Sequence, residues 1–411
     1  MTRDASVLNE LLNVGSVIGL FLIAFSYIFL PVILMSIGKL RRGLLRVDPN
    51  EPLVLPKIGV VVAAHNEQEV IVHLLESCLA LDYPADRLRV FIGDDGSSDA
   101  TVPRIRSFAD SRICCRAYPE RRGKSSVIND LMADDELRSF DPSVTLFCDA
   151  KSVLSQNAAR AIAASFADPE VGCVALKLRM VSEEGKAVGE GLYWKYEMRL
   201  KALEDNLGCV MGCNGGGFGM RTALFEPISP GIIVEDLVLS LQTLMKGYRI
   251  CFAHNAQVEQ PACADVKSEW LRKVRIGAGN FQALGPCAGL LNPFRGVPSL
   301  VFWGHKVLRW FTPILLALVW ACDLAALATV GGFARIAHEA SLSLGVFVAL
   351  SAILCWLRPS GAGVPTILKL AGYFGLMNFA LVIGLVRFLR RTQQVTWDKA
   401  DRAWSVAKGQ A

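Results

Sequence analysis

The sequence lacks several patterns that would assign it to a common class of protein. None of its twelve cysteines lies in a paired CxxC spacing, so the cysteines do not indicate a zinc site. No stretch alternates basic with aromatic side chains, and the net charge of +5 is modest, so no nucleic-acid partner is expected. Between residues 38 and 311, no uncharged run approaches the length that crosses a bilayer. This central region is therefore expected to be exposed to water and to keep reduced, structural thiols.

The chain as a whole is nevertheless too apolar for an ordinary soluble protein. Hydrophobic residues make up 52% of it, and the mean hydropathy is +0.37. Residues 14–38 carry no charge and are long enough to cross a hydrocarbon core of roughly 30 Å. Four basic residues follow, which favours a cytoplasmic location for the next domain and contact with anionic lipids: Lys39, Arg41, Arg42 and Arg46.

Three more apolar segments lie near the C-terminus, at residues 311–333, 340–357 and 366–388. They predict a cytosolic domain held between membrane helices. The expected division is a membrane helix with its basic segment at 1–50, the cytosolic domain at 51–285, an interfacial segment at 286–310, membrane helices at 311–390 and a polar tail at 391–411. Three crossings after the domain would put the basic residues 387–392 outside, against the positive-inside tendency. Either one apolar segment does not cross, or a stretch around residues 290–303 lies in the interface or crosses as well.

Strands and helices alternate in the central region. The runs "IGVVVAA", "LRVFIGDD" and "VTLFCD" read as strands, each followed by a polar loop and then by helical spacing. This order predicts an α/β domain with a mostly parallel sheet, helices on both faces and ligands at the carboxyl ends of the strands. Asp94 and Asp95 end the second strand, where Gly96 permits a sharp turn. Capping of the next helix would explain one of the two carboxylates but would leave the other without a role.

Three motifs at these strand ends are similar to motifs of a known protein family. They are Asn66-Glu67 after the first strand, "DDGSSD" after the second and "CDAK" after the third. With them, the chain resembles the family 2 glycosyltransferases, the inverting family of cellulose, chitin and hyaluronan synthases. The resemblance implies a GT-A fold with a Rossmann-like nucleotide-binding sheet, α-helical transmembrane segments and transfer of a sugar from a nucleotide diphosphate donor.

The resemblance also implies how the donor is held. Ala64, Asn66, Glu67 and Asp95 match positions that bind the uracil and ribose. Lys124, in "ERRGKSSVIND", matches a lysine that meets the diphosphate.

Asp149 matches the first aspartate of the DxD motif, which implies a Mg²⁺ or Mn²⁺ ion bridging the donor phosphates. The third position of that motif is Lys151 instead of an acidic residue. Three alternatives stay open. One carboxylate with phosphate oxygens and waters holds the ion, or Lys151 neutralises the diphosphate itself, or Lys151 points into solvent.

Two further motifs imply the catalytic residues. In "VED", Asp236 matches the general base that removes the proton of the acceptor hydroxyl, and Glu235 is expected only to cap a helix. In "SEWLRKVRI", the QxxRW motif is altered, with Arg272 at the glutamine and Arg275 at the arginine. Arg272 is assigned to the nucleotide site, and Arg275 to stabilising the diphosphate that leaves. The glycine-rich turn at residues 214–217 is expected beside the acceptor and donor.

The function implied is an inverting transfer from a UDP-sugar to a growing saccharide or lipid-linked acceptor. The enzyme would be a multi-pass protein of a bacterial inner (plasma) membrane, in contact with membrane lipids. The alternative is a non-catalytic subunit that binds a nucleotide sugar within a polysaccharide assembly complex, suggested by Lys151 and by Ile276 at the tryptophan position of QxxRW. Because few membrane spans are expected, three possibilities stay open. The chain forms a homo-oligomer, it works with partner subunits, or its product is not secreted.

Overall fold

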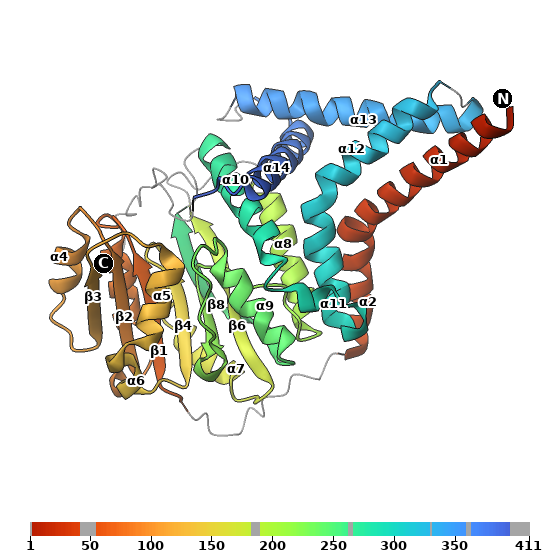
Figure 1. The fold of residues 1–411 in the computed structure, drawn as a ribbon. Helices are drawn as coiled ribbons and strands as arrows, with labels where there is room; N and C mark the ends of the chain where they lie inside the picture. The colour runs from red at the N-terminus through yellow and green to blue at the C-terminus, as the bar shows by residue number, and fades with distance from the viewer. Residues whose placement is uncertain are drawn as a thin grey trace.

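The computed structural model describes residues 2–41, 55–181, 190–261, 266–328, 331–358 and 363–394. Arg42, Arg46 and most of the expected polar tail lie outside these residues. A sheet with helices on both faces forms one part of the molecule, and long apolar helices form the other (Figure 1). The sheet has eight strands in the order β3-β2-β1-β4-β7-β6-β8-β5.

The first half of the sheet is parallel, as the sequence predicts. It contains β1 (Ile58–Ala64), β2 (Leu88–Asp95), β3 (Ile113–Tyr118) and β4 (Val144–Asp149). The helices between them are α3 (Ile71–Leu79), α4 (Thr101–Arg106), α5 (Lys124–Ala133) and α6 (Asp135–Phe140). Every residue of β1 is buried, as in a strand covered by helices on both faces.

The second half of the sheet is mixed. It contains β5 (Val153–Leu154), β6 (Val171–Val181), β7 (Phe218–Arg221) and β8 (Arg249–Pro261), with β7 antiparallel to both β4 and β6. The expectation of a mostly parallel sheet therefore fails here. The amide of Asp149 donates to the carbonyl of Gly215 at 2.9 Å, so the glycine-rich turn begins at the carboxyl end of β4. Because β7 starts at that edge, it can only run back along β4.

Buried side chains pack on both faces of the sheet. One face packs against α3, α4 and α7 (Ala158–Ser165), and the other against α5, α8 (Glu190–Asp205) and α9 (Glu235–Met245). The core of the second face continues into Leu30, Leu34, Phe302 and Trp310 of the apolar helices. The two parts of the molecule therefore share one hydrophobic core.

Four helical segments among the described residues are long and apolar enough to span a membrane. They cover Val7–Gly38, Val297–Ala326, Ala334–Leu357 and Thr366–Leu389. The elements that form them are α1 (Thr2–Ala24), a π-helical turn η1 (Phe25–Phe29), α2 (Leu30–Arg41), α11 (Val297–Val301), a π-helical turn η6 (Phe302–Val307), α12 (Leu308–Ala326), α13 (Gly332–Leu357) and α14 (Thr366–Leu389). Short 3₁₀ turns lie at Ala85–Arg87, Thr222–Leu224, Ala288–Leu291 and Pro293–Arg295. The second candidate span begins at Val297, inside the segment expected at the interface.

Buried polar contacts join helices of the apolar part to each other and to the sheet domain. Asp323 of α12 accepts a hydrogen bond from Ser16 of α1 at 2.6 Å and lies 2.8 Å from the Nδ1 of His338 in α13. His305, in η6, lies 2.9 Å from Glu197 of α8 and also contacts Glu204. The His305 contacts connect the sheet domain to the apolar helices through side chains buried in both parts.

Helix α10 (Val266–Ala283), which carries Arg272 and Arg275, packs directly on α14. The two helices lie side by side next to the sheet (Figure 1). A Cβ built on Gly384 would lie 2.7 Å from the backbone N of Ala278 and 2.9 Å from the carbonyl O of Val274. The two backbones therefore touch, and a side chain at position 384 would separate them.

We expect Gly384→Leu to destabilise the protein by about 1–3 kcal/mol, because α10 and α14 would have to move apart. The thermal unfolding midpoint of the detergent-purified chain measures this. Gly285→Ala is the control, since a Cβ there meets only the carbonyl of Gln282, at 3.7 Å. Equal midpoints for the two variants would contradict the close packing.

Candidate active site

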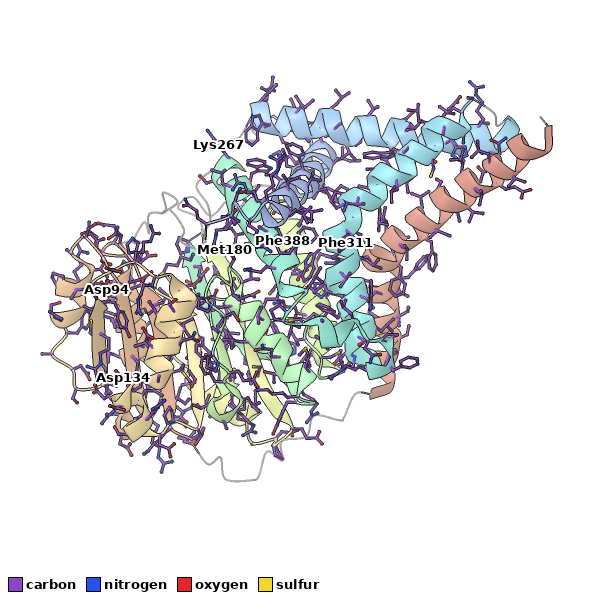
Figure 2. The ribbon with its side chains drawn as sticks, viewed as in Figure 1. Asp94, Asp134, Met180, Lys267, Phe311 and Phe388 are labelled. Carbon is purple, nitrogen blue, oxygen red and sulfur yellow. The ribbon has the colours of Figure 1, made fainter. Side chains whose placement is uncertain are left out.

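A cleft of about 1360 Å³ lies at the carboxyl ends of the strands and extends to the apolar helices. In Figure 2, Asp94 marks that edge of the sheet, and Asp134 lies at the opposite edge. Six of the predicted site residues line the cleft: Glu67, Lys124, Asp149, Asp236, Arg272 and Arg275. The other three, Ala64, Asn66 and Asp95, lie at the ends of β1 and β2 and are not among its lining residues.

Lys124 is the centre of the site. Its Nζ, at the start of α5, lies 2.5 Å from Asp149 at the end of β4 and 2.5 Å from Glu235 at the start of α9. Burial alone would lower the pKa of Lys124, but the negative charges of Asp149 and then Glu235 outweigh it and raise that pKa. Burial would likewise raise the pKa of Asp149, but the charges of Lys124 and Lys151 outweigh it and hold that pKa below its usual range. The ammonium and the Asp149 carboxylate therefore both stay ionised.

Glu235 is a site residue that sequence reasoning missed. It was expected only to cap α9, yet its carboxylate shares Lys124 with Asp149 and its side chain is 8% exposed. Gln260 of β8 was also missed. Its Nε2 donates to Asp149 at 2.9 Å and to Ser152 at 3.0 Å. No local motif marks Gln260, because it approaches Asp149 only through the sheet.

Asp236 follows Glu235 at the start of α9 and accepts the amide of Leu237 at 2.8 Å. Burial, and then the charge of Glu235, raise the pKa of Asp236 to about 6. A Cβ built on Gly215 would lie 3.3 Å from oxygens of both Asp149 and Asp236. The glycine at this position therefore leaves room between the two carboxylates.

The paired aspartates at the end of β2 hold loops in place. Asp95 is fully buried and accepts the amides of Arg122 at 2.7 Å and Gly123 at 2.8 Å. These residues lead directly into Lys124, so Asp95 positions the lysine. Asp94 accepts the amide of Ser97 at 2.9 Å across a turn in which Gly96 has a φ of +67°. Each carboxylate thus has a structural partner, and the predicted contact of Asp95 with ribose stays a prediction.

The loops after β1 and β2 are bound to each other. The amide of Asn66 donates to Ser97 at 2.8 Å, and the side chain of Asn66 accepts the amide of Ser98 at 2.9 Å. The amide of Glu67 donates to Thr101 at 2.8 Å. Asn66 has a φ of +53°, a conformation that asparagine tolerates better than most residues. Asn66 is thus part of the scaffold, whereas Glu67 reaches the cleft.

The two arginines of α10 also line the cleft. Arg272 donates two hydrogen bonds to Glu269, at 2.8 and 2.7 Å. Burial lowers the pKa of Arg275, partly offset by the charges of Glu235 and Asp149. Arg275 therefore lies within the field of the same carboxylates that hold Lys124.

A family profile described as "Glycosyltransferase like family 2" matches residues 56–274, which is more than half of the 411-residue chain. The chain belongs to this family. A solved structure of a mannosyltransferase from Pyrobaculum calidifontis, in complex with GDP-Man and Mn²⁺, covers 91% of this glycosyltransferase-family chain with a TM-score of 0.64 and 19% identity. The match covers 99% of that chain. At this identity it shows the fold, the GT-A fold expected from the sequence.

Three curated relatives each match a little over half of the chain. The beta-monoglucosyldiacylglycerol synthase of Synechocystis sp. is 27% identical over 240 residues, covering 55% of this chain and 48% of the relative. The N-acetylglucosaminyltransferase of Rhizobium meliloti is 28% identical over 257 residues, covering 57% and 58%. The poly-beta-1,6-N-acetyl-D-glucosamine synthase of Staphylococcus aureus is 24% identical over 238 residues, covering 56% of each. The chain spans about half the length of these relatives.

The donor set at Asp149 does not fit an ion held between acidic ligands. Among the described residues, no group of three or more histidine, cysteine, aspartate or glutamate side chains is arranged to hold a metal. The position between Asp149 and Glu235 contains the ammonium of Lys124. The other oxygen of Asp149 has Lys151 at 3.8 Å. The residues around Asp149 therefore do not fit a divalent ion held by acidic side chains.

Side chains of the apolar helices also line the cleft. They include Tyr373, Phe374 and Met377 of α14, Trp310 of α12 and Arg387 at the C-terminal end of α14. The cleft is therefore formed jointly by the sheet domain and the apolar helices.

The raised pKa of Asp236 predicts how the transfer rate depends on pH. A general base must be deprotonated, so we expect kcat/KM to be constant above about pH 7 and to fall about tenfold per pH unit well below 6. Initial rates at low donor and acceptor concentrations between pH 4.5 and 8 measure this, and circular dichroism at each pH checks that the protein stays folded. A constant kcat/KM down to pH 5 would show that no base with this pKa acts in the transfer.

Proposed function

We propose that the chain is a membrane-bound inverting glycosyltransferase that transfers a sugar from a UDP-sugar to an acceptor at the membrane surface. One observation carries the proposal. A carboxylate with a pKa near 6, Asp236, shares a cleft with Lys124 and Arg275, and the same cleft extends to the apolar helices. A base and cations around one open space are what a single displacement at the anomeric carbon needs.

In the proposed reaction, Asp236 takes the proton of the acceptor hydroxyl as its oxygen attacks the anomeric carbon. The bond from that carbon to the diphosphate breaks on the opposite face, and its electron pair stays with the phosphate oxygen. Lys124 and Arg275 stabilise the negative charge of the leaving diphosphate. Attack from the opposite face inverts the anomeric configuration. A pKa near 6 keeps Asp236 mostly ionised near neutral pH, while leaving it basic enough to accept a proton.

The family supports a nucleotide diphosphate sugar as donor, and we propose a UDP-hexose or a UDP-N-acetylhexosamine. Relatives named as an N-acetylglucosaminyltransferase and a poly-N-acetylglucosamine synthase support the latter sugar. Ala64, Asn66, Glu67, Asp95 and Arg272 are proposed to hold the nucleotide. GDP-mannose belongs in any donor test, because the mannosyltransferase of the same fold is in complex with GDP-Man.

The aromatic residues that line the cleft support an acceptor that approaches from the bilayer. Tyr373, Phe374 and Trp310 offer apolar surface, which suits a lipid-linked acceptor. A relative named as a glucosyldiacylglycerol synthase also supports a lipid acceptor, whereas the poly-N-acetylglucosamine synthase supports a growing saccharide. We propose the lipid-linked acceptor first.

Placement in a bacterial inner membrane, with the sheet domain in the cytoplasm, is part of the same proposal, as are a homo-oligomer or partner subunits. Two observations support this placement. Four helices are long and apolar enough to span a membrane, and Arg387, at the C-terminal end of α14, lines the cleft. The non-catalytic alternative has no support in the comparisons, and the presence of Asp236 with an ordered Lys124 weighs against it. The Mg²⁺ or Mn²⁺ ion expected at Asp149 is supported by the Mn²⁺ in the mannosyltransferase complex, but Lys151, with its Nζ 3.8 Å from Asp149, opposes a cation there.

Asp236→Asn tests the proposal. We expect it to lower the transfer rate by at least about 100-fold, because the amide cannot accept the proton. Binding of UDP should change less than about twofold in the same variant. The measurement is release of nucleotide diphosphate by the full chain in lipid nanodiscs, with a panel of UDP-sugars and GDP-mannose.

Asp135→Asn is the matched control, since Asp135 is also an aspartate in the first turn of a helix but is exposed to solvent. It should leave the rate unchanged. A wild-type rate in Asp236→Asn would remove Asp236 as the base.

A further inference from the structure

Lys151 lies in a turn whose geometry is fixed on both sides. The turn joins β4 to β5, and the amide of Ser152 donates to the carbonyl of Asp149 at 3.0 Å. Ala150 is 3% exposed and Ser152 is fully buried, and Gln260 binds the side chains of both Asp149 and Ser152. With its neighbours buried, Lys151 lines the cleft, and its Nζ lies 3.8 Å from Asp149.

The charge at this position is the reverse of what a DxD motif would have. Lysine in place of aspartate changes the formal charge from minus one to plus one, a difference equal to the charge of one divalent cation. Lys124 adds a second ammonium on the other oxygen of Asp149, where its Nζ is shared with Glu235. The two lysines thus flank the carboxylate that was predicted to bind the ion.

We propose that Lys151, together with Lys124, supplies the positive charge at the donor diphosphate, so that transfer by this chain does not need a divalent metal ion. The proposal rests on the proposed function above. As the bond between the anomeric carbon and the diphosphate breaks, its electron pair goes to the phosphate oxygen. The ammonium groups donate hydrogen bonds to the diphosphate and stay protonated throughout.

Nucleotide binding tests this without knowledge of the acceptor. The full chain in nanodiscs, dialysed against EDTA and shown by elemental analysis to be free of metal, is titrated with UDP and with UMP. We expect the Kd of UDP to be the same within about twofold in EDTA and in Mn²⁺. UDP binding that requires Mn²⁺ would overturn the proposal.

Variants of Lys151 separate a contact with the diphosphate from a structural effect. Lys151→Ala should weaken UDP binding about 10- to 100-fold, the effect of losing a charge-assisted hydrogen bond, and should weaken UMP binding much less. Lys151→Arg should restore most of the loss. The control is Lys177→Ala, since Lys177 is an exposed lysine of β6. Equal losses for UDP and UMP, or no loss, would each overturn the role of Lys151.

Lys151→Asp tests the exchange of lysine for metal directly. This variant restores the acidic pair, so we expect UDP to bind weakly in EDTA and to regain affinity in Mn²⁺. An affinity for UDP that Mn²⁺ does not change would count against the exchange. A wild-type chain that binds neither UDP nor GDP in any buffer would overturn the proposed function itself. Binding that needs Mn²⁺ would leave that function standing and overturn only the lysine proposal.

Discussion

The active site depends on one partly buried cation shared by two carboxylates. Lys124 connects the start of α5, the end of β4 and the start of α9 through Asp149 and Glu235. An ammonium that is partly removed from water is stabilised by the opposite charges around it, and the carboxylates are stabilised by the cation in turn. The three elements are therefore held at a fixed separation. Asp236 follows Glu235, so the same contact fixes the position of the proposed base.

Two glycines allow close packing that connects the active site to the apolar helices. Gly215 leaves room between Asp149 and Asp236, and Gly384 lets α14 touch α10, which carries Arg275. The contacts of His305 with Glu197 and Glu204 join α8 to the helices as well. The sheet domain and the apolar helices therefore pack against each other around the cleft, and side chains of both line it.

The charges around Asp149 show how a glycosyltransferase fold can accommodate a change in its motif. Lys151 reverses the charge at a position where the family has an acidic residue, yet the surrounding turn stays ordered through Ser152 and Gln260. Because the turn is fixed, any side chain at position 151 would lie at the same place in the cleft. The chemistry of the site can therefore change through one residue without a change in the fold.

The sequence alone predicts the family, three of the parallel strands and six residues of the cleft. It could do so because strand ends of a parallel sheet meet at one edge, so motifs after β1, β2 and β4 had to converge. Three features depend on the tertiary structure: the contact of Glu235 with Lys124, the contact of Gln260 with Asp149 and the antiparallel direction of β7. Glu235 resembles a helix cap until Lys124 reaches it from another element, and Gln260 reaches Asp149 only across the sheet. The role of Asp95 as the anchor of the loop before Lys124 was likewise invisible, because it depends on amides that follow it by almost thirty residues. A local sequence pattern shows which residues can carry charge. The residues that pair with those charges in the folded protein come from segments distant in the chain, so the pattern does not identify them.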